Sequence, residues 1–180
     1  MSDLTPGEPW VEPQRIELDP VPLAVLRAER ATLADLPRLF DTGYRRLGAL
    51  PAAGVELAGP AVAVYRGDPQ GVFDLEIGFP LQVPLERALP GAAGESDVVA
   101  SVLPAGPAVA VSHLGGYEGL GAAWVRLLEK SGAEPAGTFV EVYVSDPSQP
   151  GTPRTDLLLP LGRPGGASRP DGGTRVRPPG

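Results

Sequence analysis

The segment Val140-Glu-Val-Tyr-Val-Ser-Asp-Pro147 has a close counterpart in the first half of the chain, Val62-Ala-Val-Tyr-Arg-Gly-Asp-Pro69. Each segment is followed by a second apolar stretch that ends in Pro-Leu, at Leu81 in the first half and at Leu161 in the second. Because Gly, Asp and Pro favour turns, each pair of stretches is typical of two strands joined by a hairpin. The shared motif and its shared continuation indicate two related halves arranged as a tandem repeat.

Each half also begins with a strand and a helix. Residues 22–28 and 108–112 alternate in the manner of strands. In the first half Thr32 and Asp35 have the spacing of a helix capping box, and in the second an apolar helical stripe ends at Gly132. We therefore expect an α+β fold in which two pseudo-two-fold strand–helix–strand–strand units form an antiparallel sheet. Both helices would cover one face, and a ligand cleft would lie on the other.

The distribution of Gly, Pro and small residues predicts the ordered region. The expected boundaries are a flexible N-terminus at 1–12, a ligand-binding domain at 13–162 with halves 13–85 and 98–162, a linker at 86–97, and a disordered tail at 163–180. The tail has one aliphatic side chain larger than alanine, so it buries too little apolar area to offset its ordering entropy. Trp10 is the one N-terminal side chain expected to pack on the body.

Composition excludes several classes of site. The 180 residues include 22 acidic and 15 basic side chains, one histidine (His113) and no cysteine. Thiolate catalysis, disulfides and multi-histidine metal sites are therefore excluded, and we expect neither metal nor cofactor. The net charge of −7 argues against direct nucleic-acid binding. No apolar run approaches the roughly 18 residues of a membrane span, which predicts a soluble, cytoplasmic protein. Arginine outnumbers lysine, as in the GC-rich genomes of actinobacteria.

The segment that contains Glu141 carries the chemistry. Side chains alternate across a strand, so Phe139, Glu141 and Tyr143 share one face, and Val140 and Val142 share the other. We expect the valines to pack against the helices and the carboxylate between two aromatic rings to face the cleft. The alternative is a surface glutamate between ordinary cross-strand aromatics.

The first half supports the cleft. Ala63 stands at the position of Glu141 and leaves space beside Tyr65. The next strand is expected to place Glu76 on the same face as Tyr65, opposite to the helices. Carboxylates among aromatic rings suit a flat, lipophilic organic cation, through cation–π attraction and charge pairing.

The run Leu103-Pro-Ala-Gly-Pro-Ala-Val-Ala-Val-Ser-His-Leu-Gly-Gly-Tyr117 contains an LPAG turn, a small-residue strand and an H-x-G-x-Y motif. With the E-x-Y pattern at Glu141 and the D-x-E-x-G pattern at Asp74, it resembles the GyrI-like small-molecule-binding domains. These include the effector-binding domains of multidrug-sensing regulators of the BmrR and Rob type. The resemblance covers residues 13–162. It implies a pocket glutamate at Glu141 with Tyr143 beside it, and Tyr117 at the mouth of the second helix.

Three functions follow as hypotheses. The first is a stand-alone, monomeric binding protein for bulky lipophilic, often cationic molecules, with a role in drug resistance or as a transcription effector. Its ligand-binding residues would be Glu141, Tyr143, Phe139, Tyr117, Tyr65, Glu76 and Ala63. The second, implied by the resemblance, is a hydrolase of cyclopropane-bearing DNA-alkylating antibiotics, with Glu141 and Tyr117 as catalytic residues. The third is a protein-interaction role of the gyrase-inhibitor kind. His113 is expected to bond locally rather than to act as a base.

Overall fold

The computed structural model describes residues 4–145 and 150–162. All its strands belong to one antiparallel eight-stranded sheet with the order β1-β6-β8-β7-β3-β4-β2-β5. The strands are β1 (Gln14–Leu18), β2 (Val21–Ala31), β3 (Ala61–Gly67), β4 (Phe73–Pro80), β5 (Val99–Leu103), β6 (Gly106–Leu114), β7 (Thr138–Tyr143) and β8 (Arg154–Pro160). The helices are α1 (Leu36–Leu47) and α2 (Leu120–Ser131), with single 3-10 turns at η1 (Leu33–Asp35), η2 (Pro51–Ala53) and η3 (Tyr117–Gly119).

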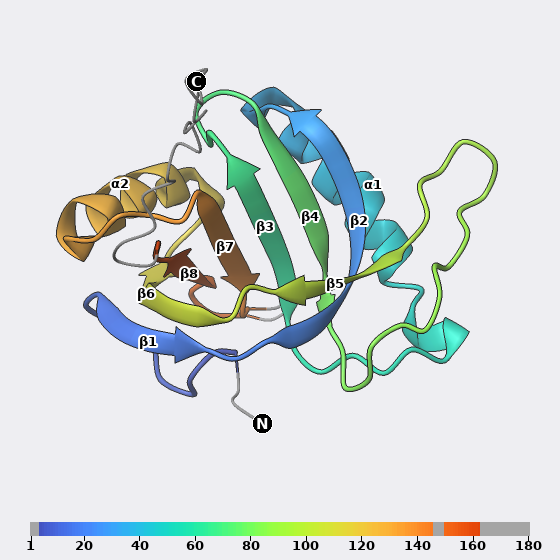
Figure 1. Cartoon of the computed structure of the whole chain (residues 1–180), viewed down its shortest axis with the longest axis horizontal. Coiled ribbons are helices and arrows are strands. Elements are labelled where there is room, and N and C mark those ends of the chain that lie inside the picture. Colours follow the sequence, from blue (N-terminus) through green and yellow to red (C-terminus); the bar gives the residue numbers. More distant parts are fainter. Residues whose placement is uncertain (1–3, 146–149, 163–180) are drawn as a thin grey trace, which may run out of the picture.

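The expected α+β fold is confirmed. The elements β2-α1-β3-β4 and β6-α2-β7-β8 run in the same strand–helix–strand–strand order, and β3 pairs with β7 at the middle of the sheet. Figure 1 shows the sheet strongly curled, with α1 behind β2 and β4 and α2 beside the β6–β8 side. The Asp35 carboxylate accepts hydrogen bonds from the Thr32 N–H (3.0 Å) and hydroxyl (2.9 Å), as the capping pattern predicts.

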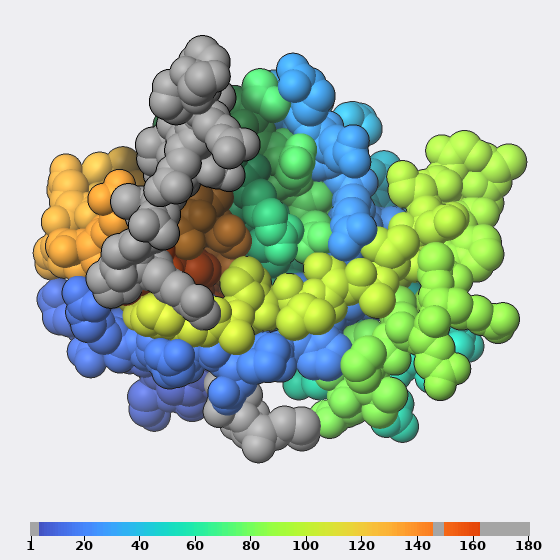
Figure 2. Space-filling model, viewed as in Figure 1, coloured from blue at the N-terminus to red at the C-terminus, as the bar shows by residue number. Residues whose placement is uncertain are grey.

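Two strands, β1 and β5, extend the sheet at its edges. Each pairs with the opposite half of the chain, β1 with β6 and β5 with β2. Figure 2 shows the result as two bands, blue and yellow-green, that lie side by side across one face of the molecule. This exchange closes the curl of the sheet and encloses an apolar core.

The core has two sides. Inside the curl, strand residues from both halves pack together, and Trp10 and Leu4 cover them from the N-terminal segment. The backbone N–H of Ser112 donates a hydrogen bond to the carbonyl oxygen of Trp10. The backbone N–H of Trp10 in turn donates to the hydroxyl oxygen of Ser112, at 2.9 Å. On the outer side, α1 and α2 each cover a separate apolar cluster. Trp10 therefore packs on the body as the sequence predicts.

The orientation predicted for β7 was wrong. Val140 and Val142 pack inside the curl with other strands, and Phe139 and Tyr143 pack on the side that carries the helices. The physical reason is that both faces of this central strand are buried, so alternation shows which residues share a face but not which face meets the helices.

Among the described residues, neither helix is long and apolar enough to cross a bilayer.

Candidate functional site

Glu141 lies at the centre of a buried hydrogen-bond cluster, although it is a carboxylate. Only 6% of the residue is exposed. Its Oε2 accepts hydrogen bonds from the hydroxyls of Tyr143 (2.6 Å) and Tyr65 (3.1 Å), and its Oε1 accepts one from the Trp124 indole N–H (2.8 Å). The donors come from β7, β3 and α2, so the cluster joins both halves of the sheet to the second helix.

All three donors to Glu141 are neutral. Within residues 4–145 and 150–162, none of the ion pairs involves Glu141. Hydrogen bonds from neutral groups satisfy the lone pairs of a buried carboxylate, but they leave its negative charge without a counter-charge. Among the described residues, the Glu141 carboxylate therefore has hydrogen-bond donors for both of its oxygens but no positive charge to balance its own.

Aromatic rings surround this carboxylate. The Tyr143 ring makes edge contacts with Phe40 and Tyr44 of α1, at centroid distances of 6.1 and 6.3 Å, and with Tyr117 of η3 at 5.9 Å. The Tyr143 ring thus lies where α1 and the start of the α2 segment approach each other. Tyr117 is 58% exposed and forms the outer part of the cluster.

The tyrosine hydroxyls act as donors at any physiological pH. Burial raises the pKa of Tyr44, Tyr65 and Tyr143, and the negative charge of Glu141 raises each of them further. Because these hydroxyls keep their protons, Tyr65 and Tyr143 continue to donate hydrogen bonds to the carboxylate.

Most of the residues selected from the sequence lie together. Ala63 is the cross-strand neighbour of Glu141, and Tyr65 is the neighbour of Phe139. Phe139 also contacts the Trp124 ring edge-on, at 5.5 Å. The residues that the structure brings together are Glu141, Tyr143, Phe139, Tyr117, Tyr65 and Ala63. They lie on the side of the sheet that carries the helices, not on the opposite side where the cleft was expected.

The predicted position of Glu76 was wrong. The register of β3 and β4 pairs Tyr65 with Leu75, so Leu75 shares the face of Tyr65 and Glu76 faces the inside of the curl. There Glu76 bonds to Arg27 (2.8 Å), Arg66 (3.0 Å) and Ser101 (2.8 Å). Burial alone would raise the pKa of Glu76, but the hydrogen bonds from these three side chains together lower it below its usual value.

Three residues of the cluster were not predicted as site residues: Trp124, Tyr44 and Phe40. All three have helical spacing, which favours a core role. For Trp124 one signal was available, because a buried indole N–H usually finds an acceptor. The local role expected for His113 is confirmed, since its Nε2 lies 2.9 Å from the Gly116 carbonyl oxygen.

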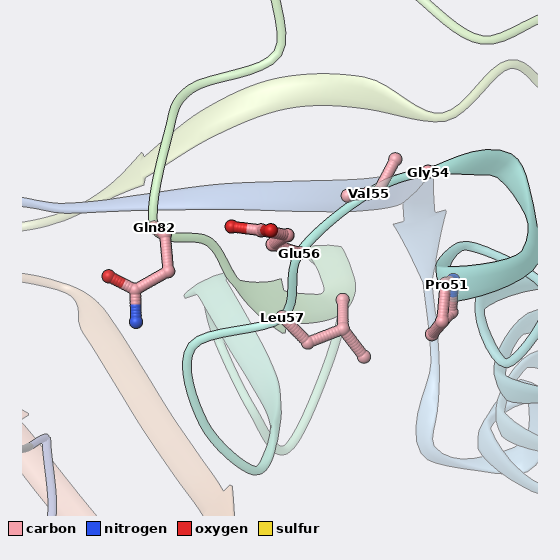
Figure 3. Close-up of a pocket in the computed structure, with 6 residues that line it drawn as sticks. All are labelled: Pro51, Gly54, Val55, Glu56, Leu57 and Gln82. Carbon is pink, nitrogen blue, oxygen red and sulfur yellow. The ribbon is translucent and has the colours of Figure 1, made fainter.

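The structure also contains a hollow that lies apart from Glu141. It has a volume of about 670 Å³ and is open to solvent. Figure 3 shows that its lining comes from the η2 turn, the segment after it and the segment that follows β4, through Pro51, Gly54, Val55, Glu56, Leu57 and Gln82. Glu56 and Gln82 are exposed, so no buried charged group selects a ligand there. The described residues form no cluster of His, Cys, Asp or Glu that could hold a metal.

Comparison with known proteins supports the fold. No family model matches the sequence, and no curated protein matches it. SAV2435 bound to tetraphenylphosphonium is 10% identical, with a TM-score of 0.58 over 85% of this chain and 95% of that one. The EcmrR C-terminal domain is 18% identical, with a TM-score of 0.62 over 84% and 97%. A hydrolase from Listeria innocua is 14% identical, with a TM-score of 0.51 over 87% and 94%.

Proposed function

Because the chain has the GyrI-like fold, we propose that it binds bulky, lipophilic organic cations at Glu141. The observation that carries this proposal is the buried carboxylate whose two oxygens, among residues 4–145 and 150–162, are bonded only to neutral aromatic donors. A ligand that brings a positive charge to this cluster supplies the counter-charge that the described residues lack. Burial strengthens such an attraction, because the surroundings screen it less than water does.

The surrounding rings favour the same ligand class. Tyr143, Tyr117 and Trp124 are aromatic, and a cation is attracted to the faces of such rings, more strongly when the pair is removed from water. Tetraphenylphosphonium, the ligand of the structurally similar SAV2435, is a cation of this kind. Since Glu141 is nearly inaccessible, a ligand of that size reaches it only when side chains around Tyr117 and Tyr143 move aside.

Calorimetric titration of the full chain with tetraphenylphosphonium tests the proposal. We expect Glu141→Gln to weaken binding about thirtyfold, which corresponds to about 2 kcal/mol for a desolvated cation contact. Glu56→Gln is the matched control, because it removes a carboxylate from the separate hollow of Figure 3 and should leave the affinity unchanged. Equal affinities of wild type and Glu141→Gln, or no binding by wild type, would refute the proposal.

A hydrolase is the second candidate. The Tyr143 hydroxyl lies 2.6 Å from the Glu141 carboxylate, and a hydrolase from Listeria innocua shares the fold. In this scheme Glu141 takes a proton from water as the water oxygen attacks a strained cyclopropane carbon. The cyclopropane carbon–carbon bond breaks, and its electron pair moves into a conjugated dienone ring, whose carbonyl oxygen becomes a phenolate. Tyr117 donates a hydrogen bond to that oxygen. Mass spectrometry of a cyclopropane-bearing alkylating antibiotic incubated with the protein would then detect a product one water heavier, formed with turnover.

The biological setting is also part of the proposal. We expect the protein to act in the cytoplasm as a monomer, without direct contact with nucleic acid, and to protect against toxic cations or report their presence. A protein-interaction role of the gyrase-inhibitor kind ranks third, because it makes no use of the Glu141 cluster. Binding to a protein partner that is unaffected by Glu141→Gln would favour that role.

A further inference from the structure

The turn between β6 and α2 presents Tyr117 to the Glu141 cluster. Tyr117 is 58% exposed, and its ring meets Tyr143 edge-on at 5.9 Å. Burial therefore does not fix the position of this ring. The backbone of the turn sets where this side chain starts, since Tyr117 begins the single 3-10 turn of η3.

His113, the last residue but one of β6, holds this turn. Its Nε2 lies 2.9 Å from the Gly116 carbonyl oxygen. A carbonyl only accepts hydrogen bonds, so Nε2 is the protonated nitrogen and the donor. The same carbonyl accepts the N–H of Gly119 at 3.1 Å, so the bond that closes the turn and the bond from His113 share one acceptor.

Glycines around the His113 ring make this contact possible. A Cβ at Gly119 would lie 2.7 Å from the ring Cε1, and a Cβ at Gly115 would lie 3.4 Å from Nε2. Gly115 also has a φ of 143°, which side chains disfavour. The imidazole thus packs against the backbone on both sides of Tyr117 and bonds to the residue directly before it.

We infer that His113 is a positioning residue for ligand binding, which acts by holding the Gly115–Gly119 turn so that Tyr117 forms one wall of the site. This inference rests on the proposed function, because the wall matters only if a ligand enters beside Tyr143. His113 touches neither Glu141 nor Tyr143 through any hydrogen bond of the described residues. Its influence on the ligand therefore passes through Tyr117.

A double-mutant cycle with tetraphenylphosphonium tests the coupling in the full chain. His113→Phe keeps a ring but removes the donor, and it should weaken binding about two- to fivefold, the effect of losing one exposed cation–π contact. Tyr117→Ala should weaken binding by the same factor. The double variant, His113→Phe with Tyr117→Ala, should bind no more weakly than Tyr117→Ala alone. His113→Gln, which retains an N–H donor, should bind close to wild type. Val102→Ala, an exposed substitution in β5, is the control. If the loss of affinity in the double variant equals the product of the two single losses, His113 and Tyr117 act independently and the inference is overturned.

Hydrogen exchange provides a measurement that needs no ligand. In His113→Phe we expect faster exchange of the Gly119 amide, whose acceptor is shared with His113, and unchanged exchange of Leu127 in the middle of α2. Unchanged exchange at Gly119 would overturn the inference even if tetraphenylphosphonium binds. If His113→Phe shows faster exchange at Gly119 but the wild type binds no tetraphenylphosphonium, the proposed function is refuted. The role of His113 in holding the Gly115–Gly119 turn would then still stand.

Discussion

Glu76 and Glu141 are both 6% exposed, and both lie on central strands of the same sheet, but their surroundings are opposite in kind. Glu76 faces the inside of the curl and is bonded to two arginines and a serine. Glu141 faces the helices and is bonded to two tyrosines and a tryptophan.

Burial alone therefore does not identify a functional carboxylate. The charge of Glu76 is neutralised inside the fold, and its bonds tie β4 to β2, β3 and β5. The charge of Glu141 has no such partner among the described residues. The chemical type of the partners, cationic or neutral, thus separates a carboxylate that stabilises the sheet from one that is available to a cationic ligand.

High pH should break the Glu141 side of this comparison first and with the largest effect. The raised pKa values of Tyr44, Tyr65 and Tyr143 mean that their stabilisation is complete below pH 10 or so and is lost as the pH rises further. At pH 11 each tyrosine should cost on the order of 1 kcal/mol, and the three together roughly 3–4 kcal/mol. The free energy of urea unfolding between pH 8 and 11 measures this. Tyr65→Phe should show a shallower decline, and a decline identical to wild type would contradict the assignment.

Neutralising each glutamate separately should give unequal losses of stability. Glu76→Gln removes the counter-charge of Arg27 and Arg66, and we expect a loss of about 2–3 kcal/mol. Both arginines reach solvent, which keeps the cost from being larger. Glu141→Gln should change stability by less than about 1 kcal/mol, because an amide can still bond to the tyrosine hydroxyls and no cation is stranded. Chemical denaturation of the two variants decides this, and equal losses would remove the distinction between the sites.

Trp124→Phe tests the neutral donors directly. The variant deletes the indole N–H that donates to Glu141 and should cost about 1–2 kcal/mol in unfolding free energy, since the acceptor that loses this donor is charged. In a Glu141→Gln background the same substitution should cost less, because the acceptor there is neutral. If the cost is the same in both backgrounds, the indole stabilises the fold by packing rather than through the carboxylate.

Low pH should affect the Glu76 side, with the smallest effect. A pKa below the ordinary value near 4.3 means that Glu76 contributes stability above that pH and loses it as the pH falls through its folded-state pKa. Between pH 5 and 2.5, the Tm of thermal unfolding should therefore fall less steeply with decreasing pH in Glu76→Gln than in wild type. Parallel curves would show that other carboxylates account for the acid sensitivity.

The sequence predicted the strands that flank the helices, both helices and the grouping of Glu141 with Tyr143, because these depend on local spacing. It predicted the grouping of Glu141 with Tyr65 through the correspondence of the two halves, which meet where β3 pairs with β7. It did not predict β1 or β5, which are short edge strands whose pairing partners lie in the other half of the chain. Non-local pairing leaves no local periodic signal beyond a few alternating residues.

The errors at the site have a common cause. Alternation places Glu141 apart from Val140, but only the tertiary packing decides which face meets α1 and α2. The position of Glu76 relative to Tyr65 depends on the register between β3 and β4, and a shift of one residue exchanges the two faces. The helical spacing of Trp124 indicates that its side chain is buried, but it does not show what the indole N–H contacts.

The reciprocal pairing of β1 with β6 and of β5 with β2 has a consequence for synthesis on the ribosome. When the first half of the chain has emerged, β2 still lacks its outer neighbour, and β1 has nothing to pair with. A nascent chain therefore carries open strand edges at β1 and β2 until β5 and β6 have left the exit tunnel. For the same reason a chain cut between β4 and β5 yields two fragments, each of which holds the edge strand that the other needs.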